Sequence, residues 1–211
     1  MTIHCRGEEL ILSKEKAIYW PARQTLIISD LHIGKSAHFR KSGIQVPATV
    51  GAADLTRLSA EIDRYQPETL LITGDMFHHT LNSDVALFAA WRQFYPELRV
   101  LLIKGNHDTL KAADYIRLNI EVCEKELILA PFRFIHDKPE VSDEFFNITG
   151  HIHPGITIYG KARQRLRFPC FYFSKNCAVL PAFSAFTGLS KISPEDGAAF
   201  YAITPTRVVK V

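Results

Sequence analysis

The chain has 211 residues, of which 47% are hydrophobic and 22% are charged, and its formal net charge is +3 at pH 7. These proportions argue against disorder and against a fibrous repeat, and the length suits a single domain over residues 1–211. No apolar run approaches the roughly 20 residues that cross a bilayer, and residues 1–9 lack the apolar stretch of a signal peptide. We therefore expect a cytoplasmic protein with no membrane partner.

The first half of the chain alternates strand patterns with helix patterns. The N-terminal segment predicts a hairpin, with Gly7-Glu8 as its turn and residues 9–12 as its second strand. Further along, Leu55, Leu58 and Ile62 recur three and four residues apart, which gives a helix one apolar stripe. The strand patterns cover residues 26–28, 70–72 and 100–103, and the helix patterns cover residues 50–65, 85–95 and about 110–118. We expect an α/β layered fold in which helices cover a sheet.

After about residue 119 the helical period disappears and strand patterns follow one another. They cover residues 122–129, 132–135, 145–148, 156–159, 164–173, 177–180 and 198–203. The second half is therefore expected to be mostly β. Pattern and composition alone leave open both a β-sandwich flanked by helices and a doubly wound α/β fold.

Five of the strand patterns stop at residues that can bind a metal through oxygen or imidazole nitrogen. If the chain stays extended there, Asp30 and His32 point to the same side and reach one ion, and the two oxygens of Asp75 can bridge two ions about 3.5–4 Å apart. The terminating motifs are Ser29-Asp30-Leu31-His32, Gly74-Asp75, Gly105-Asn106-His107-Asp108, His136-Asp137 and Gly150-His151-Ile152-His153. Imidazole suits manganese, iron, zinc or nickel better than calcium or magnesium. The pattern predicts a two-metal site at the ends of the strands.

The order of these motifs resembles that of the calcineurin-like metallophosphoesterases, and the resemblance runs from about residue 20 to residue 190. Residues 30–35 and 39–47 are similar, more narrowly, to the bacterial ligase-associated DNA damage response endonuclease/phosphoesterase (PdeM-like) branch of that superfamily. The resemblance implies a β-sandwich flanked by helices with a dinuclear metal site at one edge. It implies two divalent cations, manganese first, with iron, zinc or nickel as alternatives.

The resemblance also implies a role for each motif residue. The first ion would take Asp30, His32, His153 and a bridging Asp75, and the second ion would take Asp75, Asn106, His136 and His151. Catalysis would rest on His107, which protonates the leaving oxygen or stabilises charge on the phosphate, with Asp108 orienting its imidazole. The alternative for His107 is a histidine that only supports the metal ligands.

Several further residues are candidates for contact with a phosphate-bearing substrate. Lys35, His38 and Arg40 are expected on the loop after the first metal motif, and His78 and His79 follow Gly74-Asp75 closely. The cations Lys161, Arg163, Arg165 and Arg167 alternate with other residues, so in a strand they would share a face that could follow a phosphodiester backbone. The aromatic residues at 168 and 171–173 could stack on unpaired bases. The structural alternatives are a solvated loop, rim histidines and a charged edge strand.

These observations favour a metal-dependent phosphodiesterase, and within that class a nuclease that acts on DNA during repair, with attack by a hydroxide that bridges the metals. A DNA ligase, an exonuclease or a helicase are the partners that the branch resemblance suggests. Hydrolysis of cyclic nucleotides or other small phosphoesters stays open, as does a catalytically silent metal-binding scaffold. The sequence leaves open the strandedness of the substrate, internal or terminal cleavage, and the oligomeric state.

Overall fold

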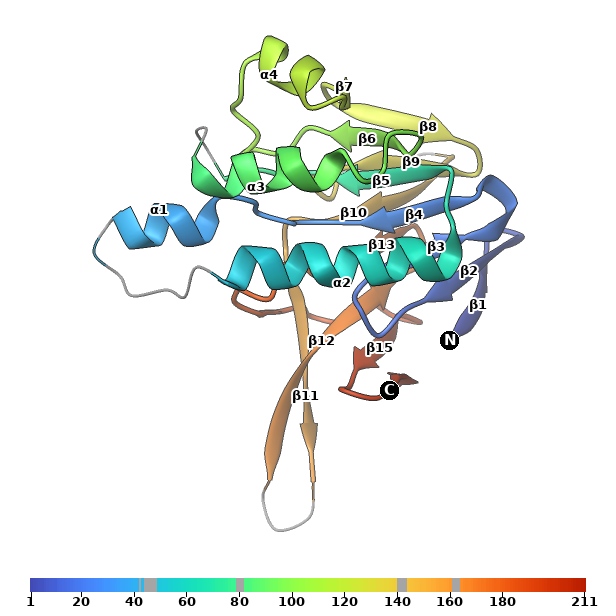
Figure 1. The fold of residues 1–211 in the computed structure, drawn as a ribbon. Helices are drawn as coiled ribbons and strands as arrows, with labels where there is room; N and C mark the ends of the chain where they lie inside the picture. Colours follow the sequence, from blue (N-terminus) through green and yellow to red (C-terminus); the bar gives the residue numbers. More distant parts are fainter. Residues whose placement is uncertain (42, 44–48, 79–81, 140–143, 161–163) are drawn as a thin grey trace.

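The structure is a computed structural model, and it describes residues 1–41, 43, 49–78, 82–139, 144–160 and 164–211. Two β-sheets pack face to face, and helices cover the outer face of the first sheet (Figure 1). The two sheets with helices on one side form a mixed α/β sandwich, so the layered fold that the resemblance implies is confirmed. Among the described residues, none of the helices has the length and apolar character needed to cross a membrane.

The first sheet combines an antiparallel half with a parallel half. Its strands, in spatial order, are β1 (Thr2–Cys5), β2 (Glu8–Leu12), β3 (Ile18–Trp20), β4 (Thr25–Ile28), β5 (Thr69–Thr73), β6 (Arg99–Ile103) and β7 (Glu121–Cys123). From β4 to β7 neighbouring strands are parallel, so their carboxyl ends meet at one edge. The segments that join these strands contain α1 (Lys35–Lys41), α2 (Thr49–Tyr65), α3 (Ser83–Arg92) and α4 (Ala112–Arg117), and a 3-10 turn, η1 (Pro21–Arg23), precedes β4.

The alternation of side chains along the parallel strands divides the core into two layers. In β4, Leu26 and Ile28 point toward the helices, where they pack with residues of α2 such as Leu58. The intervening Ile27 points the other way and packs against the second sheet, with Phe134 among its cluster. These residues are 0% exposed, which explains why the strands read as continuous apolar runs: both of their faces are covered.

The second sheet has nine strands and carries the rest of the chain. Its main path runs β14 (Ser190–Lys191), β11 (Pro154–Tyr159), β12 (Arg165–Phe173), β13 (Cys177–Val179), β10 (Phe146–Thr149), β9 (Phe132–Ile135), β8 (Glu126–Leu129), while β15 (Ala199–Ile203) pairs with β12 and with β16 (Val208–Lys210). Strands β9 and β10 are parallel, so the residues that follow them also meet at one end of the sheet. The distal part of the β11–β12 hairpin leaves the sandwich and projects from the molecule (Figure 1).

Three local expectations were wrong. The hairpin turn is Arg6-Gly7, because both residues have positive φ and Cys5 pairs with Glu8, the geometry of a two-residue hairpin loop. The expected strand over residues 122–129 is two strands, β7 and β8, which belong to different sheets. The expected loop after the first metal motif is the helix α1, which a residue distant in sequence holds in place, as described below.

Candidate metal centre

The loops that follow β4 and β5 continue the sheet pairing beyond the strands themselves. The backbone N–H of Asp30 donates to Gly74 O (3.1 Å), and that of His32 donates to Asp75 O (2.9 Å). In the second sheet, the N–H of Gly150 donates to His136 O (3.1 Å). The first ligand motifs therefore lie side by side because their loops are hydrogen bonded to one another.

The first cluster joins the two sheets. Asp30 and His32 come from the loop after β4, and His153 comes from the residue before β11; one ligand atom of each lies within 4.8 Å of the others. The Nε2 atoms of His32 and His153 are 3.4 Å apart, and His153 Nε2 is 3.2 Å from Asp30 Oδ1. Two imidazole nitrogens that face each other beside a carboxylate need a shared proton or a cation between them, so these donors fit a metal ion.

The second cluster lies around His136, the residue after β9. The Nε2 atom of His136 is 3.4 Å from Asp75 Oδ2, 3.1 Å from His151 Nδ1 and 3.2 Å from Asn106 Oδ1. Its other ring nitrogen, Nδ1, lies 2.9 Å from Thr73 O and fixes which nitrogen faces the cluster. A carboxylate, an amide oxygen and two imidazoles again form a donor set that fits a divalent cation.

Asp75 and His136 stabilise the charged forms of each other. Burial opposes ionisation of Asp75, but the hydrogen bond and charge of His136 and the N–H of His107 outweigh burial and lower its pKa to about 2. Burial likewise opposes protonation of His136, yet Asp75 raises its pKa to about 9. Burial lowers the pKa of His32 to about 3. Only neutral imidazole ligates a metal, so binding at the second cluster must release a proton.

The backbone of the ligand loops differs from the extended geometry that the sequence suggested. Positive φ angles occur at Asp30 (52°), His32 (50°), Asp75 (51°), His151 (65°) and His153 (53°). Asp30 and His32 therefore converge on one cluster through left-handed residues and not through extended chain, while His151 and His153 belong to different clusters. Each costs roughly 1–2 kcal/mol relative to right-handed or extended backbone, so strain concentrates at this edge of the sandwich.

Gly74 allows the second cluster to close. Its φ is +89°, and a Cβ at this position would overlap the imidazole of His136. The residue immediately before Asp75 therefore has no room for a side chain.

His107 and Asp108 follow Asn106 in the loop after β6 and have different environments. The side chain of His107 is 30% exposed, with Nε2 4.0 Å from Asp75 Oδ2, while its backbone N–H donates to Asp75 Oδ1 (2.9 Å). Asp108 is buried, and its carboxylate accepts the backbone N–H groups of Phe77 (2.8 Å) and Gly105 (2.9 Å). Burial raises its pKa to about 6. Through these backbone contacts Asp108 holds the loops after β5 and β6 together.

The candidate substrate residues are spread over two regions. His79, Lys161 and Arg163 lie outside the described residues. Arg165 and Arg167 lie in β12, the second strand of the hairpin that follows His153, and neither belongs to a cluster. His38 and His78 lie near the metal centre, where the ring of His78 is 5.2 Å from that of His38 and 4.8 Å from that of His107.

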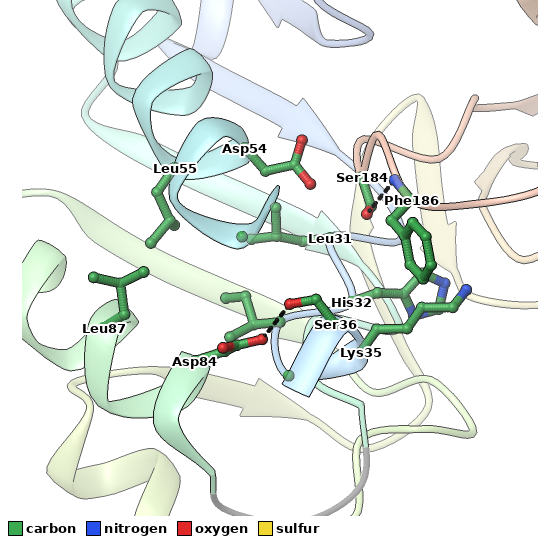
Figure 2. A pocket seen from close by; sticks show the side chains of 13 residues that line it. Leu31, His32, Lys35, Ser36, Asp54, Leu55, Asp84, Leu87, Ser184 and Phe186 are labelled. Carbon is green, nitrogen blue, oxygen red and sulfur yellow. Dashed lines mark hydrogen bonds between the residues drawn. The ribbon is translucent and has the colours of Figure 1, made fainter. Parts of the chain in front are cut away.

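Lys35 and Arg40 have different environments on α1. Lys35 lines a cavity with His32 and Phe186 (Figure 2). Burial lowers the pKa of Lys35, and the charges of Asp30 and Asp75 oppose that shift. Arg40 instead pairs with Asp84 (3.2 Å). Of these two cations, Lys35 is the one beside the cluster.

Asp84 is a residue that the sequence analysis missed. It is 7% exposed, and its carboxylate accepts from Ser36 Oγ (2.6 Å, Figure 2) and from Ala37 N (3.1 Å), which fixes the start of α1. Neighbouring Asn82 caps α3 and donates to Gly34 O. The Asn82-Ser83-Asp84 segment carries an N-cap signal in the sequence, but nothing there indicates the contact with α1, 48 residues away.

The comparisons with known proteins identify the class. Residues 24–173 match the model of the calcineurin-like phosphoesterase family, so the chain belongs to this family. It is a metal-dependent phosphoesterase, a hydrolase.

Among solved structures, the chain is similar to the Pseudomonas putida nuclease MPE, with 33% identity and a TM-score of 0.84, over 100% of this chain and 99% of that one. The Aquifex aeolicus protein AQ665 (18% identity, TM-score 0.43, over 65% and 81%) and the E. coli phosphoesterase Yfce (12%, 0.46, 89% and 97%) are more distant, and likeness at this level does not bear on function. No curated protein gives a significant match.

Proposed function

We propose that this protein hydrolyses phosphodiester bonds in DNA, using two divalent cations held at the edge of the sandwich. The observation that carries the proposal is that all seven candidate ligands converge there from both sheets. The likeness to a nuclease over the full chain supports a polynucleotide substrate.

The ligand assignment follows the two clusters. The first cation would be held by Asp30, His32 and His153, and the second by Asn106, His136 and His151. Asp75, whose Oδ2 lies 3.4 Å from His136 Nε2 and whose charge also acts on His32, would be shared between them. The bound cations would lower the pKa of water for attack on phosphorus and neutralise the phosphate oxygens.

His107 would act on the leaving group. Its backbone is fixed by the N–H donated to Asp75, while its imidazole is partly exposed beside both clusters. A protonated Nε2 in this position could give its proton to the departing oxygen as the P–O bond breaks. Lys35, which lines the same cavity as His32, would contribute positive charge close to the incoming phosphate.

Manganese is the proposed metal, with iron, zinc or nickel as alternatives, because the imidazoles make the site softer than a calcium or magnesium site. We further propose a cytoplasmic, single-domain enzyme of the ligase-associated (PdeM-like) branch that works in DNA repair with a DNA ligase, an exonuclease or a helicase. Small-molecule phosphoesters, including cyclic nucleotides, are the second candidate substrates, since the same ligand set can act on them.

The test compares manganese-dependent hydrolysis of bis(p-nitrophenyl) phosphate with that of p-nitrophenyl phosphate. Asp75→Asn controls for contaminating activity, and Asp63→Asn, an exposed residue of α2, is the matched substitution outside the site. Diester hydrolysis that is lost only in Asp75→Asn supports the proposal. Hydrolysis of the monoester alone would favour a small-molecule phosphatase, and activity on neither substrate would favour a scaffold.

A further inference from the structure

The projecting hairpin of β11 and β12 begins at the metal centre. Strand β11 starts at Pro154, the residue after His153. The hairpin is antiparallel, with Tyr159 opposite Arg165 and Thr157 opposite Arg167. We call residues 154–159 and 165–169 the arm. At about 3.3 Å per residue, Tyr159 lies roughly 20 Å along the chain from His153.

The two faces of the arm differ in chemistry. Residues directly opposite each other in an antiparallel pair share a face, so Thr157, Tyr159, Arg165 and Arg167 lie together on what we call the cationic face. All four are exposed, and Tyr159 is 70% exposed. The other face carries the apolar pairs Ile156–Phe168 and Ile158–Leu166.

A groove of about 600 Å³ runs along the base of the cationic face. Its walls are the arm, through Tyr159 and Arg167, and strand β14, through Lys191, with Phe200 of β15 beside them. Arg167 donates to the carbonyl oxygen of Leu189 and so is held at the edge of the groove.

The groove wall is built by a close approach of two backbone segments. A Cβ on Gly155 would come within 2.7 Å of Leu189 Cβ, so glycine is needed for the β14 segment to pack against the arm. The groove therefore has a fixed base, although its outer wall is a projecting hairpin.

The cations of this region have no carboxylate partner among the residues that the structure describes. Among the ion pairs of the described residues, none joins Arg165, Arg167 or Lys191 to a carboxylate. The guanidinium of Arg165 lies over the ring of Tyr159, 5.6 Å from its centroid. An exposed aromatic ring beside unpaired cations is the combination that binds unpaired bases and their phosphates.

We propose that the cationic face and its groove bind a single strand of nucleic acid that extends from the metal centre along the arm. This inference rests on the proposed function, because it concerns the substrate of the same site. Arg165, Arg167 and Lys191 contact phosphates, and Tyr159 stacks on a base. A base inside a duplex is already stacked on both faces, so stacking on Tyr159 selects a single strand over a duplex.

The experiment measures binding of a fluorescent single strand of about 12 nucleotides by anisotropy, with phosphorothioate linkages that resist cleavage, to the manganese-loaded protein. The arm variant is Arg165→Ala/Arg167→Ala/Lys191→Ala. The control variant, Arg64→Ala/Lys111→Ala/Arg117→Ala, removes the same charge from exposed positions on α2, before α4 and on α4. Tyr159→Leu and Tyr159→Phe separate the aromatic contribution from the apolar one.

The arm variant is expected to weaken binding about tenfold or more and to lower the slope of log K against log salt by about 2, since each phosphate contact contributes about 0.7 for a single strand. Tyr159→Leu should weaken binding roughly 5- to 100-fold, and Tyr159→Phe should restore it. The control variant should retain most of the affinity. A duplex of the same length should bind less tightly than the single strand.

Equal affinity and equal salt slope in the arm and control variants would overturn the proposal, and so would a preference for duplex. Light scattering of the same samples gives a further contrary outcome: a dimer that the arm variant turns into a monomer would assign the arm to a second copy of the chain. The proposed function is judged separately by hydrolysis of bis(p-nitrophenyl) phosphate, which has no flanking nucleotides. A wild-type protein that hydrolyses this diester while the arm variants bind strands normally would retain the proposed chemistry and lose only this inference.

Discussion

The metal edge, by which we mean the edge of the sandwich that carries the seven candidate ligands, is adjacent in sequence to the arm. The two regions differ in backbone conformation and in burial. At the metal edge, His151 and His153 have left-handed backbone, and Asp30, which accepts the N–H of His151 (3.0 Å), is 0% exposed. One residue later the chain enters a regular strand whose outer part is exposed. Strained residues persist where many contacts determine their positions, whereas a surface that recognises a repeating polymer needs accessible side chains instead. The candidate metal ligands therefore lie on strained, left-handed backbone, whereas the exposed side chains of the arm lie on regular strands.

The largest effect is expected from a substitution at the metal edge. Asp75→Asn should reduce diester hydrolysis more than about 100-fold and also reduce the bound metal, because in the proposed assignment this carboxylate would be shared by both cations. Metal analysis beside the kinetics checks this, with Asp63→Asn as the control. Full metal content in Asp75→Asn would show that the clusters do not depend on this carboxylate, and the contrast between edge and arm would weaken.

A second substitution separates chemistry from metal binding within the same edge. His107→Ala should reduce kcat by about 10²–10⁴-fold, the range expected for loss of a general acid, while both metals stay bound. Steady-state kinetics and metal analysis on one preparation test this. Loss of metal from His107→Ala would make His107 a support for the ligands and remove its role in proton transfer.

Removal of the metal ions should lower the Tm of the protein. Cations bound only by the folded chain stabilise it by about 2.7 kcal/mol per site at a free concentration 100 times Kd, which corresponds to a rise in Tm of roughly 5–10 °C for a chain of this size. Scanning calorimetry after chelation, and again after titration with manganese or calcium, measures the shift. Manganese should raise Tm more than calcium does; an equal effect would argue against imidazole ligands.

The smallest effect is expected at a buried carboxylate that lies away from both the metal edge and the arm, where burial of the charge should lower the stability of the fold. Glu61 on α2 is 2% exposed, and burial raises its pKa despite the hydrogen bond from Ser13. The folded protein therefore binds this proton more tightly than the unfolded chain, so stability falls as the pH rises from the unfolded pKa through the raised folded pKa. Glu61→Gln should raise the unfolding free energy by up to about 1 kcal/mol at neutral pH.

The gain from Glu61→Gln should vanish below the pKa of the unfolded carboxyl, near 4.3. Urea unfolding of wild type and variant at pH 4 and at pH 7.5 would show the difference. A gain that is equal at both pH values would indicate a packing effect and would not support a cost of buried charge.

The sequence predicted those features that depend on neighbouring residues. The strands that end at Asp30, Asp75, Asn106, His136 and His151 could be found because apolar runs give way abruptly to polar ligands. The left-handed backbone of these residues could not be found, since it is imposed by hydrogen bonds between loops. The same is true of α1, whose first turn depends on Asp84, and of the division between β7 and β8, where the chain passes from one sheet to the other.

The hydrogen bond between His151 and Asp30 spans 121 positions of the chain. During synthesis, a growing polypeptide that has exposed Asp30, His32 and Asp75 still lacks His136, His151 and His153, so neither set of donors is complete. In the proposed assignment, cation loading would therefore follow the folding of both sheets, and a chain truncated before residue 136 would carry ligands but no complete donor set. Hydrolysis would therefore require the whole sandwich to be folded, because each cluster takes ligands from both sheets.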